Sequence, residues 1–569
     1  MSDDFNFIVG GEAGQGVQSL GFLLAKVFVR GGYHVFADQD YESRVRGGHN
    51  FFRVRVKKGE VCAISETVDM LIALNDETIE RHRGELSAKG TAIFNNEKST
   101  FGGDKRFFGL PLEKLAKENV GNIVMSNTVA LGAALALVDY PFDNIAKVIT
   151  EFFSNAKVAL DNVAAAKAGY DYIISQRRDD FPQSLAPLAE AKRMLINGNE
   201  ALALGALAAG CKFMSAYPMT PATSIMQYLA AQEKNFGLVM VHVEDEIAAV
   251  NMAIGASYAG VRSMTATSGS GFCLMVEGLG LAGITETPLV IVNAQRPGPA
   301  CGLPTRTEQG DLQFVLHAHH GEFPRAVLAP ATAASAFWTA VKAFNWADKY
   351  QLPVVILTDH HLASSYYTVE PFDLTGVTID RGLLYAGEES AGAYQRHALT
   401  KSGVSPRAFP GLSKALVVTD SDEHDEWGHL TEDANMRTEQ VRKRMRKLVS
   451  LHQDIAPPLR YGPEGAEITL VGWGSTYGAL HEAVSILQKE GASINMIHLE
   501  DLWPFPTEPV LDTLSRVKKS ICIESNATGQ LARLIRTETG LKPNCDILRY
   551  DGRPITPAYI AAAVRKECR

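Results

Sequence analysis

The sequence predicts a multi-domain α/β protein, and three observations lead to this prediction. The chain has 569 residues, whereas a single hydrophobic core stops growing at roughly 250–300 residues. Strand-like apolar runs alternate with helical segments, which is typical of parallel sheets covered by helices on both faces. This pattern stops and restarts twice along the chain. We therefore expect α/β domains at residues 1–180, 192–370 and 461–569, with a linker at 181–191 and a connecting segment at 371–460.

The first domain is expected to begin with a strand, a glycine loop and a helix. The apolar run FNFIV (5–9) precedes GGEAGQG (10–16), and the apolar-periodic stretch VQSLGFLLAKVFVR follows at 17–30. Apolar residues at helical spacing favour a helix over that last stretch. Further strands of this domain are expected at 50–56, 70–74 and 122–127.

Two motifs of the first domain are candidates for binding a phosphate group. Glycine in a strand-to-helix turn lets a phosphate approach backbone N–H groups, which makes Gly11, Gly14 and Gly16 candidates. A tight turn without any ligand also explains these glycines. The nearby RVRGG supplies Arg44 and Arg46, whose guanidinium groups suit a phosphate, a partner's carboxylates or surface salt bridges.

The second domain contains SAYPMTPATS (215–224), where a strand ends in two prolines. Proline fixes φ and lacks an N–H, so Pro218 should stop the strand, while Pro221 suits the first turn of a helix. Thr220 is then expected at the N-cap of that helix. It would lie at the carboxyl end of a strand, where parallel sheets bind ligands. The strands of this domain are expected at 211–217, 237–243, 263–268, 288–295 and 352–359.

A helix of the second domain opens with three consecutive acids in VEDEIAAVNMAIGASYAG (243–260). Acids in a first turn are favoured by the helix dipole, so one or two need no functional reason. An apolar, Ala- and Gly-rich face follows Glu246, so we expect this residue to be buried with a raised pKa. Glu244 and Asp245 can remain solvated.

Two further stretches of the second domain follow expected strands. TATSGSGFCLM (265–275) places Thr267, Ser268 and Gly269 between a strand and an apolar helix. NAQRPGPACGLPTRTEQGDL (293–312) is a long Gly- and Pro-rich loop, and loops of that length are usually functional or disordered. Its polar residues are Arg296, Arg306, Glu308 and Gln309.

The remainder of the chain forms a polar connecting segment and a third α/β unit. The connecting segment contains one charged helix, expected at 433–453. The third unit has strand-like runs at 468–474, 494–500 and 519–526.

Composition excludes several classes of protein. The net charge is −9, and the chain has no basic run that would indicate nucleic-acid binding. No apolar stretch reaches the roughly 20 residues of a membrane span, and the acidic start is unlike a secretory signal, so we expect a cytoplasmic protein. The seven cysteines never form a C-x-x-C pair, which argues against a zinc or iron–sulfur site held by this chain alone. The stretches HAHH (317–320) and EHDEWGH (423–429) lack acidic second ligands at helical spacing, so no metal site is expected.

Several of these motifs together resemble one enzyme family. YPMTPAT, VEDEIAAVNMAIGASYAG, MTATSGSGFCLM and GLPTRTEQGDL, in this order, resemble the α subunit of 2-oxoacid:ferredoxin oxidoreductases. GGEAGQG with RVRGG resembles the family's γ domain, fused here ahead of α. The resemblance covers essentially the whole chain, and the fused arrangement with SGVSPRAFPG and DSDEHDEWGH is most similar to the 2-oxoglutarate type.

The resemblance implies a fold and an activity. It implies an N-terminal γ-type domain, a thiamine-diphosphate pyrimidine-binding parallel-sheet domain and a C-terminal transketolase-C-like domain. The implied reaction converts 2-oxoglutarate and coenzyme A reversibly to succinyl-CoA, CO2 and reduced ferredoxin. In the reverse direction it fixes CO2, as in a reductive tricarboxylic acid cycle. Pyruvate or branched-chain 2-oxoacids are alternative substrates, and a nucleotide-binding flavoprotein or regulatory module is an alternative of a different class.

The resemblance also implies roles for particular residues. Glu246 matches the carboxylate that hydrogen-bonds the aminopyrimidine of the cofactor, and Arg306 matches the arginine that holds the 2-oxoacid carboxylate. Thr220 and Tyr217 are implied at the substrate end of the cofactor. The remaining cofactor candidates are Pro218, Thr267, Ser268 and Gly269. Coenzyme A would be handled by the γ domain and the C-terminal unit, with Gly11, Gly14, Gly16, Arg44 and Arg46 as phosphate candidates.

Two absent motifs imply a partner subunit. The chain lacks the G-D-G and downstream Asn that bind Mg²⁺ and the diphosphate in thiamine enzymes, and it lacks cluster cysteines. In the family these parts belong to a β subunit. We therefore expect activity only with a β subunit that carries Mg²⁺ and the [4Fe–4S] cluster, an active site at the interface, ferredoxin as electron acceptor and an (αβ)2 heterotetramer.

Overall fold

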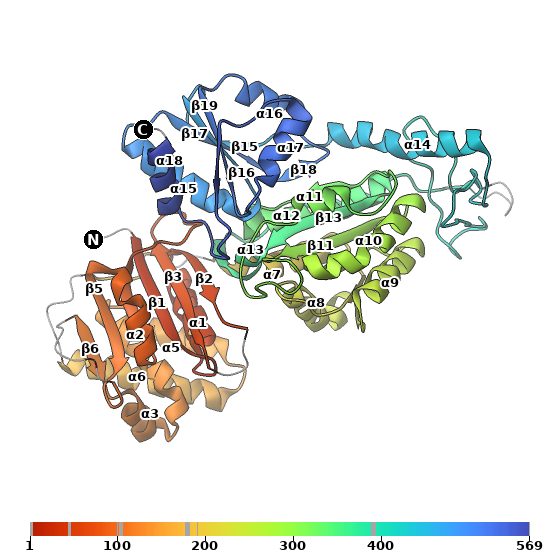
Figure 1. The fold of residues 1–569 in the computed structure, drawn as a ribbon. Helices are drawn as coiled ribbons and strands as arrows, with labels where there is room; N and C mark the ends of the chain where they lie inside the picture. The colour runs from red at the N-terminus through yellow and green to blue at the C-terminus, as the bar shows by residue number, and fades with distance from the viewer. Residues whose placement is uncertain are drawn as a thin grey trace. The chain divides into compact units, whose positions relative to one another are not determined.

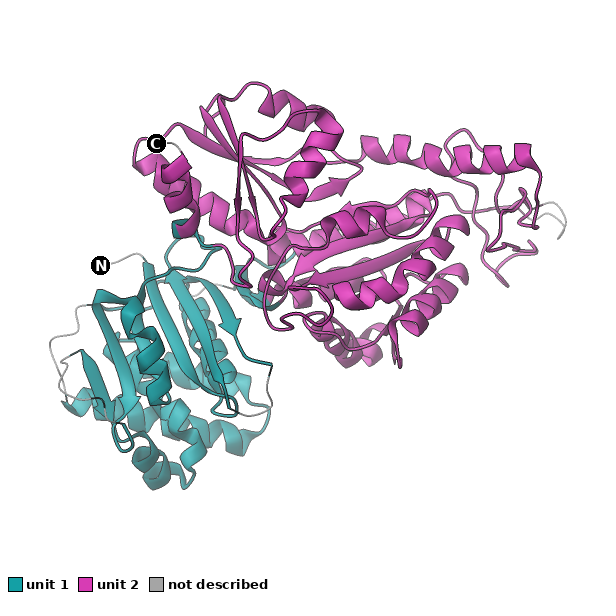
Figure 2. Ribbon diagram, viewed as in Figure 1, with its two compact units in different colours: residues 1–196, 364–372, 556–558 teal, residues 197–363, 373–555, 559–569 magenta. Residues whose placement is uncertain are grey.

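The computed structural model describes residues 4–43, 47–99, 101, 106–176, 183–189, 192–387 and 394–567. The chain divides into two compact units (Figure 2). The first comprises residues 1–196, 364–372 and 556–558, and the second comprises residues 197–363, 373–555 and 559–569. No helix among the described residues is long and apolar enough to cross a membrane.

The first unit contains a mixed eight-stranded sheet with helices on both faces (Figure 1). The strand order is β6-β5-β4-β1-β3-β2-β14-β7. The strands are β1 (Asp4–Glu12), β2 (His34–Asp40), β3 (His49–Lys57), β4 (Val68–Ala73), β5 (Leu86–Asn95), β6 (Phe107–Leu110), β7 (Met194–Asn197) and β14 (Tyr366–Val369). The helices are α1 (Val17–Arg30), α2 (Asp76–His82), α3 (Leu112–Val120), α4 (Ser126–Leu137), α5 (Phe142–Phe152) and α6 (Ala156–Gln176), with short 3-10 turns at Arg83–Glu85 and Ile123–Met125.

Strand periodicity divides the core of this unit into two layers. Phe5, Phe7 and Val9 of β1 pack in the cluster that contains α1 and α4. Ile8 packs on the opposite face with Ile79 of α2, as expected when successive side chains point to opposite faces. The expected strand at 5–9 and the expected helix at 17–30 are confirmed by β1 and α1.

The strand expected at 122–127 is wrong. These residues form a 3-10 turn (Ile123–Met125) and the beginning of α4. The Asn122 side chain accepts a hydrogen bond from Val124 N at 3.0 Å, and such local side-chain bonds compete with strand pairing. Ile123 and Val124 are exposed. This apolar run therefore pairs with no neighbouring strand in the described part of the chain and does not form one.

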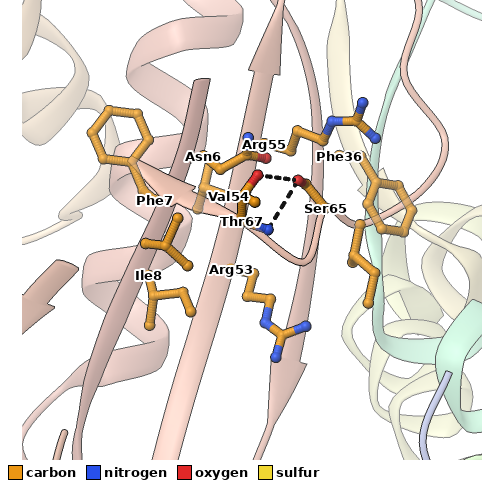
Figure 3. Close-up of a pocket in the computed structure, with 11 residues that line it drawn as sticks. Asn6, Phe7, Ile8, Phe36, Arg53, Val54, Arg55, Ser65 and Thr67 are labelled. Atoms are coloured by element: carbon orange, nitrogen blue, oxygen red, sulfur yellow. Dashed lines mark hydrogen bonds between the residues drawn. The ribbon is translucent and has the colours of Figure 1, made fainter. Parts of the chain in front are cut away.

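The first unit also has a small, partly open void between β1, β3 and the segment at 64–68 (Figure 3). Its volume is about 10 Å³, which is room for about one water molecule. Figure 3 shows the Ser65 hydroxyl bonded to Thr67 Oγ1 and N. Arg55 is held nearby by Asp4 and by the carbonyl of Ala63. The void is thus a packing feature and is too small for a cofactor.

The second unit contains a seven-stranded sheet with the order β18-β12-β13-β11-β10-β8-β9. All pairs are parallel except β12 with β18, so the C-terminal part of the chain supplies one antiparallel edge. The strands are β8 (Phe213–Ala216), β9 (Val239–His242), β10 (Ser263–Thr267), β11 (Leu289–Gln295), β12 (Ala326–Leu328), β13 (Pro353–Asp359) and β18 (Asp501–Trp503). The helices are α7 (Gly198–Ala208), α8 (Thr223–Phe236), α9 (Glu246–Tyr258), α10 (Gly269–Ile284), α11 (Leu312–His317), α12 (Ala333–Tyr350) and α13 (His360–Ser364).

A five-stranded sheet, also in the second unit, has the order β15-β17-β16-β19-β20. Its strands are β15 (Leu459–Tyr461), β16 (Ile468–Trp473), β17 (Ile494–Leu499), β19 (Lys519–Glu524) and β20 (Cys545–Leu548). The helices of this part are α14 (Ala434–Gln453), α15 (Tyr477–Lys489), α16 (Thr507–Leu514), α17 (Gln530–Thr539) and α18 (Pro557–Glu567), with 3-10 turns at Leu374–Gly376 and Gly474–Thr476. The helix expected at 433–453 is confirmed by α14.

Candidate active site

The candidate site lies where the chain reverses its direction across the seven-stranded sheet. The connection after β8 leads outward to edge strand β9, and the chain then returns across β8 to β10. The segments after β8 and β10 therefore leave in opposite directions, and open α/β sheets bind ligands in the crevice at such a point. Tyr217, Pro218 and Thr220 follow β8, and Ser268 and Gly269 follow β10.

The turn that carries Thr220 differs from the sequence prediction. Helix α8 begins at Thr223 and has Ala222 as its N-cap, so the N-cap position predicted for Thr220 is wrong. Ala222 N donates to Met219 O at 2.8 Å, which closes a turn ahead of the helix. Asn199 Nδ2 also donates to Pro221 O at 2.7 Å. Two hydrogen bonds therefore stabilise the turn that contains Thr220.

Arg296 is brought to this turn from a different strand. It follows β11 directly, and its Nη1 donates to the Thr220 carbonyl at 2.7 Å. Burial lowers the pKa of the Arg296 guanidinium, but an arginine side chain keeps its charge at neutral pH. In the sequence Arg296 appeared only as one polar residue of a long loop. Its position directly after a strand was the signal that placed it at the carboxyl edge of the sheet.

A cavity of about 390 Å³ lies beside Arg296. That volume is in the range of small-molecule sites. Asp311 shares the cavity with Arg296, and burial raises the pKa of its carboxyl. A Cβ on Gly269 would lie 2.6 Å from Asp311 Oδ2, so only glycine allows the carboxyl to approach the start of α10 this closely. The lining residues are Ser268, Gly269, Ser270, Cys273, Arg296, Pro297, Gly298, Pro299, Ala300, Asp311 and Phe314.

Glu246 occupies a buried position at the first turn of α9. Glu246 is only 4% exposed, whereas Glu244 is exposed and Asp245 is half-buried. Asp245 is the N-cap and accepts from Ala248 N at 2.6 Å. The predicted burial of Glu246 and its raised pKa, caused mainly by that burial, are confirmed.

The Glu246 carboxyl is held without a complete set of partners. Its Oε1 is buried and accepts no hydrogen bond from any residue that the structure describes. A Cβ on Gly271 would lie 2.5 Å from Glu246 Oε1 and 2.1 Å from Thr267 Oγ1, so the carboxyl occupies the space that this glycine leaves. Buried acceptors are nearly always satisfied in proteins. An unpartnered acceptor at this position is suited to bind a hydrogen-bond donor of a ligand.

The sulfur of Met219 links the Thr220 turn to the start of α10. Thr267 Oγ1 lies 3.8 Å and Ser270 Oγ lies 3.3 Å from Met219 Sδ. Ser268 Oγ is buried and, within the described chain, unpartnered. The structure thus gathers most of the predicted cofactor residues around the ends of β8 and β10.

Arg306 is placed apart from this group. It does not line the cavity, and its Nη1 donates to Thr305 O at 3.3 Å. Its Cβ lies 3.1 Å from the position of a Cβ on Gly552, beside the bond from Thr307 N to Gly552 O. The carboxylate-binding role of Arg306 stays a prediction.

The glycine loop of the first unit forms the turn between β1 and α1. Gly14 and Gly16 have φ of 97° and 76°, and a Cβ on Gly16 would lie 2.3 Å from Asn127 Nδ2. The turn therefore needs glycine for its own geometry, and the phosphate role of Gly11, Gly14 and Gly16 stays a prediction. Arg44 and Arg46 lie outside the described residues.

One buried cluster has metal-binding residue types but the wrong charge. Glu286, His397 and His424 have ligand atoms close enough for a metal ion. However, the ammonium groups of Lys443 and Lys447 each lie 2.5 Å from a Glu286 oxygen. Two lysine side chains already pair with the carboxylate, so the cluster favours a buried ion-pair network over a metal site.

Comparisons with known proteins cover all three parts of the chain. Residues 204–443 match the family described as "Pyruvate flavodoxin/ferredoxin oxidoreductase, thiamine diP-bdg". Residues 6–172 match "Pyruvate ferredoxin/flavodoxin oxidoreductase", and residues 466–560 match "Pyruvate:ferredoxin oxidoreductase core domain II". The residues around Glu246, Thr220 and Arg296 therefore lie in a thiamine-diphosphate-binding domain.

Relatives match over nearly the whole chain. The subunit alpha of 2-oxoacid:ferredoxin oxidoreductase 2 from Aeropyrum pernix is 32% identical over 99% of this chain and 97% of its own length. The 2-oxoglutarate oxidoreductase subunit KorA of Mycobacterium tuberculosis is 30% identical over 92% of this chain and 86% of its own length.

A solved structure shares the whole fold. It is the 2-oxoglutarate:ferredoxin oxidoreductase from Magnetococcus marinus with 2-oxoglutarate, coenzyme A and succinyl-CoA bound. It covers 100% of both chains with a TM-score of 0.93 and 32% identity. The predicted multi-domain α/β fold class is confirmed.

Proposed function

The chain belongs to the 2-oxoacid:ferredoxin oxidoreductases, and we propose that it is the subunit that holds the pyrimidine half of thiamine diphosphate in a 2-oxoglutarate-oxidising complex. The proposed reaction converts 2-oxoglutarate and coenzyme A to succinyl-CoA, CO2 and reduced ferredoxin. The observation that carries the proposal is the unpartnered, buried Glu246 Oε1 in a domain that matches a thiamine-diphosphate-binding family.

The residues around Glu246 fit thiamine diphosphate. The Glu246 carboxyl would share a proton with the aminopyrimidine ring, and burial, which raises its pKa, favours the protonated form of the carboxyl. Thr267, Ser268, Gly269 and Pro218 would form the walls against this ring. When bound, the cofactor supplies a carbon nucleophile for the 2-oxo group and accepts the electron pair that remains as CO2 leaves.

We assign recognition of the substrate's 1-carboxylate to Arg296 and the Thr220 turn. Arg296 lines the cavity and is held by the Thr220 carbonyl, which fixes the direction of its guanidinium. An oriented guanidinium binds a carboxylate with charge-assisted hydrogen bonds and excludes uncharged analogues. Tyr217 directly follows β8 and is 38% exposed, so it would be available to contact the remainder of the substrate.

The site is incomplete without a second subunit. The relatives are named subunit alpha or subunit KorA, which implies a multi-subunit complex. Helices α9 and α10 expose several apolar side chains, since Ile247, Met252 and Leu274 are 51%, 40% and 50% exposed. Apolar surface of this kind beside a site usually marks a protein interface. We infer that a β subunit covers it and supplies Mg²⁺, the diphosphate site and the [4Fe–4S] cluster in a cytoplasmic (αβ)2 assembly.

Three further assignments extend the proposal. Residues 1–180, 192–370 and 461–569 would act as the γ-type, pyrimidine-binding and transketolase-C-like domains. Gly11, Gly14, Gly16, Arg44 and Arg46 are proposed to contact the phosphates of coenzyme A. Ferredoxin would bind the complex and receive electrons from the cluster of the β subunit.

The test is a substrate comparison with the co-purified complex. We expect ferredoxin reduction to require coenzyme A and thiamine diphosphate and to have a higher kcat/KM with 2-oxoglutarate than with pyruvate or a branched-chain 2-oxoacid. A preference for pyruvate would overturn the substrate assignment. Activity with none of the three 2-oxoacids, in a complex that contains the cofactor and the cluster, would overturn the proposed function.

A further inference from the structure

The five-stranded sheet has its own ligand-binding crevice, and the chain itself fills it. From β16 the chain moves to β17 on one side, and it later crosses to β19 on the other side. The switch point is therefore between β16 and β19, where open α/β sheets usually bind a ligand. At this point lies the side chain of Gln309, which comes from the loop between β11 and α11 and is 0% exposed.

Gln309 is bonded to the ends of both strands. Its Nε2 donates to Trp473 O at 2.9 Å, and its Oε1 accepts from Ser525 N at 3.1 Å. Its backbone N donates to Ser525 O at 2.6 Å, and its backbone O accepts from Asn526 Nδ2 at 3.1 Å. All four polar groups of the residue are thus used by the sheet.

The sequence on the sheet side is shaped for this side chain. Gly474 has φ of 57°, and a Cβ at this position would lie 2.9 Å from Gln309 Nε2. Glycine is therefore required both by the backbone and by the approach of the amide. Asn526 is in turn bonded to the buried Glu524, so the receptor for Gln309 is itself fixed.

The contact between the 296–311 loop and the five-stranded sheet continues toward the cavity through Gln530 at the start of α17. Gln530 Nε2 donates to Gly310 O at 2.6 Å, and its Oε1 accepts from Gln313 N at 2.9 Å. Gly310 and Gln313 flank Asp311, which lines the cavity. The loop that begins at Arg296 is thus attached to the five-stranded sheet at its far end.

We propose that Gln309 is a positioning residue, which occupies the switch-point crevice of the five-stranded sheet and thereby holds the 296–311 loop in the shape that forms the oxoacid cavity. The C-terminal sheet then acts as a receptor for the chain's own loop. This inference rests on the proposed function for its kinetic consequence. The fixation of the loop itself does not depend on any substrate.

The test uses Gln309→Leu in the full-length chain within the purified complex. Leucine is close in size to glutamine but cannot bond Trp473 O or Ser525 N. We expect the KM for 2-oxoglutarate to rise about tenfold or more, with kcat and the KM values for coenzyme A and ferredoxin within about threefold of the parent. Hydrogen exchange of residues 297–308 should be at least about tenfold faster, because local opening of the loop becomes easier.

Gln440→Leu is the matched control. Gln440 is also 0% exposed, and its Nε2 donates to a backbone carbonyl, that of His397, at 3.0 Å. A comparable loss of thermal stability is expected in this variant, without a change in the KM for 2-oxoglutarate or in the exchange of residues 297–308. A purely structural role for Gln309 would make the two variants alike.

Gln530→Leu serves as a second variant if Gln309→Leu does not fold, and it should produce the same two changes. Unchanged KM and unchanged exchange in a folded variant would overturn the inference. A parent complex that oxidises no 2-oxoacid would instead overturn the proposed function, while the exchange measurement would still decide whether Gln309 holds the loop.

Discussion

The assignment of substrate carboxylate binding to Arg296 is tested by Arg296→Ala and Arg296→Lys in the complex with the β subunit. Arg296 lines the cavity and has its direction fixed by the 2.7 Å bond to Thr220 O. Charge-assisted hydrogen bonds contribute about 1.5–3 kcal/mol each. One such bond amounts to about 1.5–3 kcal/mol, so Arg296→Ala should lower kcat/KM by at least roughly 10-fold to 150-fold, and by more if two bonds are lost. Lysine should restore little of this loss, because it lacks the planar fork.

The assay is the initial rate of ferredoxin reduction at saturating coenzyme A with varied 2-oxoglutarate. Arg306→Ala is the matched comparison, because the sequence alone predicts the large loss at Arg306. Arg306 does not line the cavity, so the assignment to Arg296 predicts a change in kcat/KM of less than about fivefold for Arg306→Ala. The role that the sequence predicts for Arg306 would instead give a loss of roughly tenfold to 100-fold. A change of less than about threefold in Arg296→Ala, together with a loss of tenfold or more in Arg306→Ala, would refute the reasoning.

Four other predictions concern Glu246, Gly271, the chain without a β subunit and the buried lysines. Glu246→Gln should lower the rate of 2-oxoacid oxidation at least about 100-fold, because general acid–base help is lost, whereas Glu244→Gln should be much milder; equal losses in steady-state assays would show that the wrong acid is assigned. Gly271→Ala should reproduce the Glu246→Gln defect, because its Cβ would lie 2.5 Å from Glu246 Oε1; Gly84→Ala, whose Cβ would have no atom within 4 Å, should keep full activity in the same assay. The chain expressed without a β subunit should be colourless and should retain no thiamine diphosphate after gel filtration, and iron–sulfur absorbance in that sample would contradict the division of the site. Burial lowers the pKa of Lys447 to about 7 and that of Lys443 to about 8. The unfolded chain therefore binds more protons than the folded chain from about pH 7 to about pH 10, and the free energy of unfolding should rise with pH in that window. Lys447→Met should flatten the corresponding rise of Tm with pH, and an unchanged slope would contradict this prediction.

Sequence patterns predicted the features that depend on local residue spacing. The helix α1 was predicted from apolar periodicity over 17–30, and the burial of Glu246 followed from the apolar residues directly after it. Both depend on neighbours within a few turns of the chain. The same reasoning failed for 122–127, because an apolar run becomes a strand only if other strands lie beside it.

The features that the sequence did not reveal depend on distant parts of the chain. Arg296 and Arg306 lie on one loop, and the sequence distinguishes them only by the position of Arg296 directly after a strand. In the structure, Arg296 donates to Thr220 O, whereas Thr307, next to Arg306, donates to Gly552 O. The role of Gln309 depends on Trp473 and Ser525, which are more than 160 residues away in the chain.

The most direct test of the account is the position of thiamine diphosphate in a cryo-electron microscopy map of the complex with 2-oxoglutarate. We predict an aminopyrimidine nitrogen within about 3 Å of Glu246 Oε1, with the substrate carboxylate on Arg296. A cofactor ring bound elsewhere, with Glu246 Oε1 covered by protein, would contradict the central claim that the crevice between β8 and β10 is the cofactor half-site.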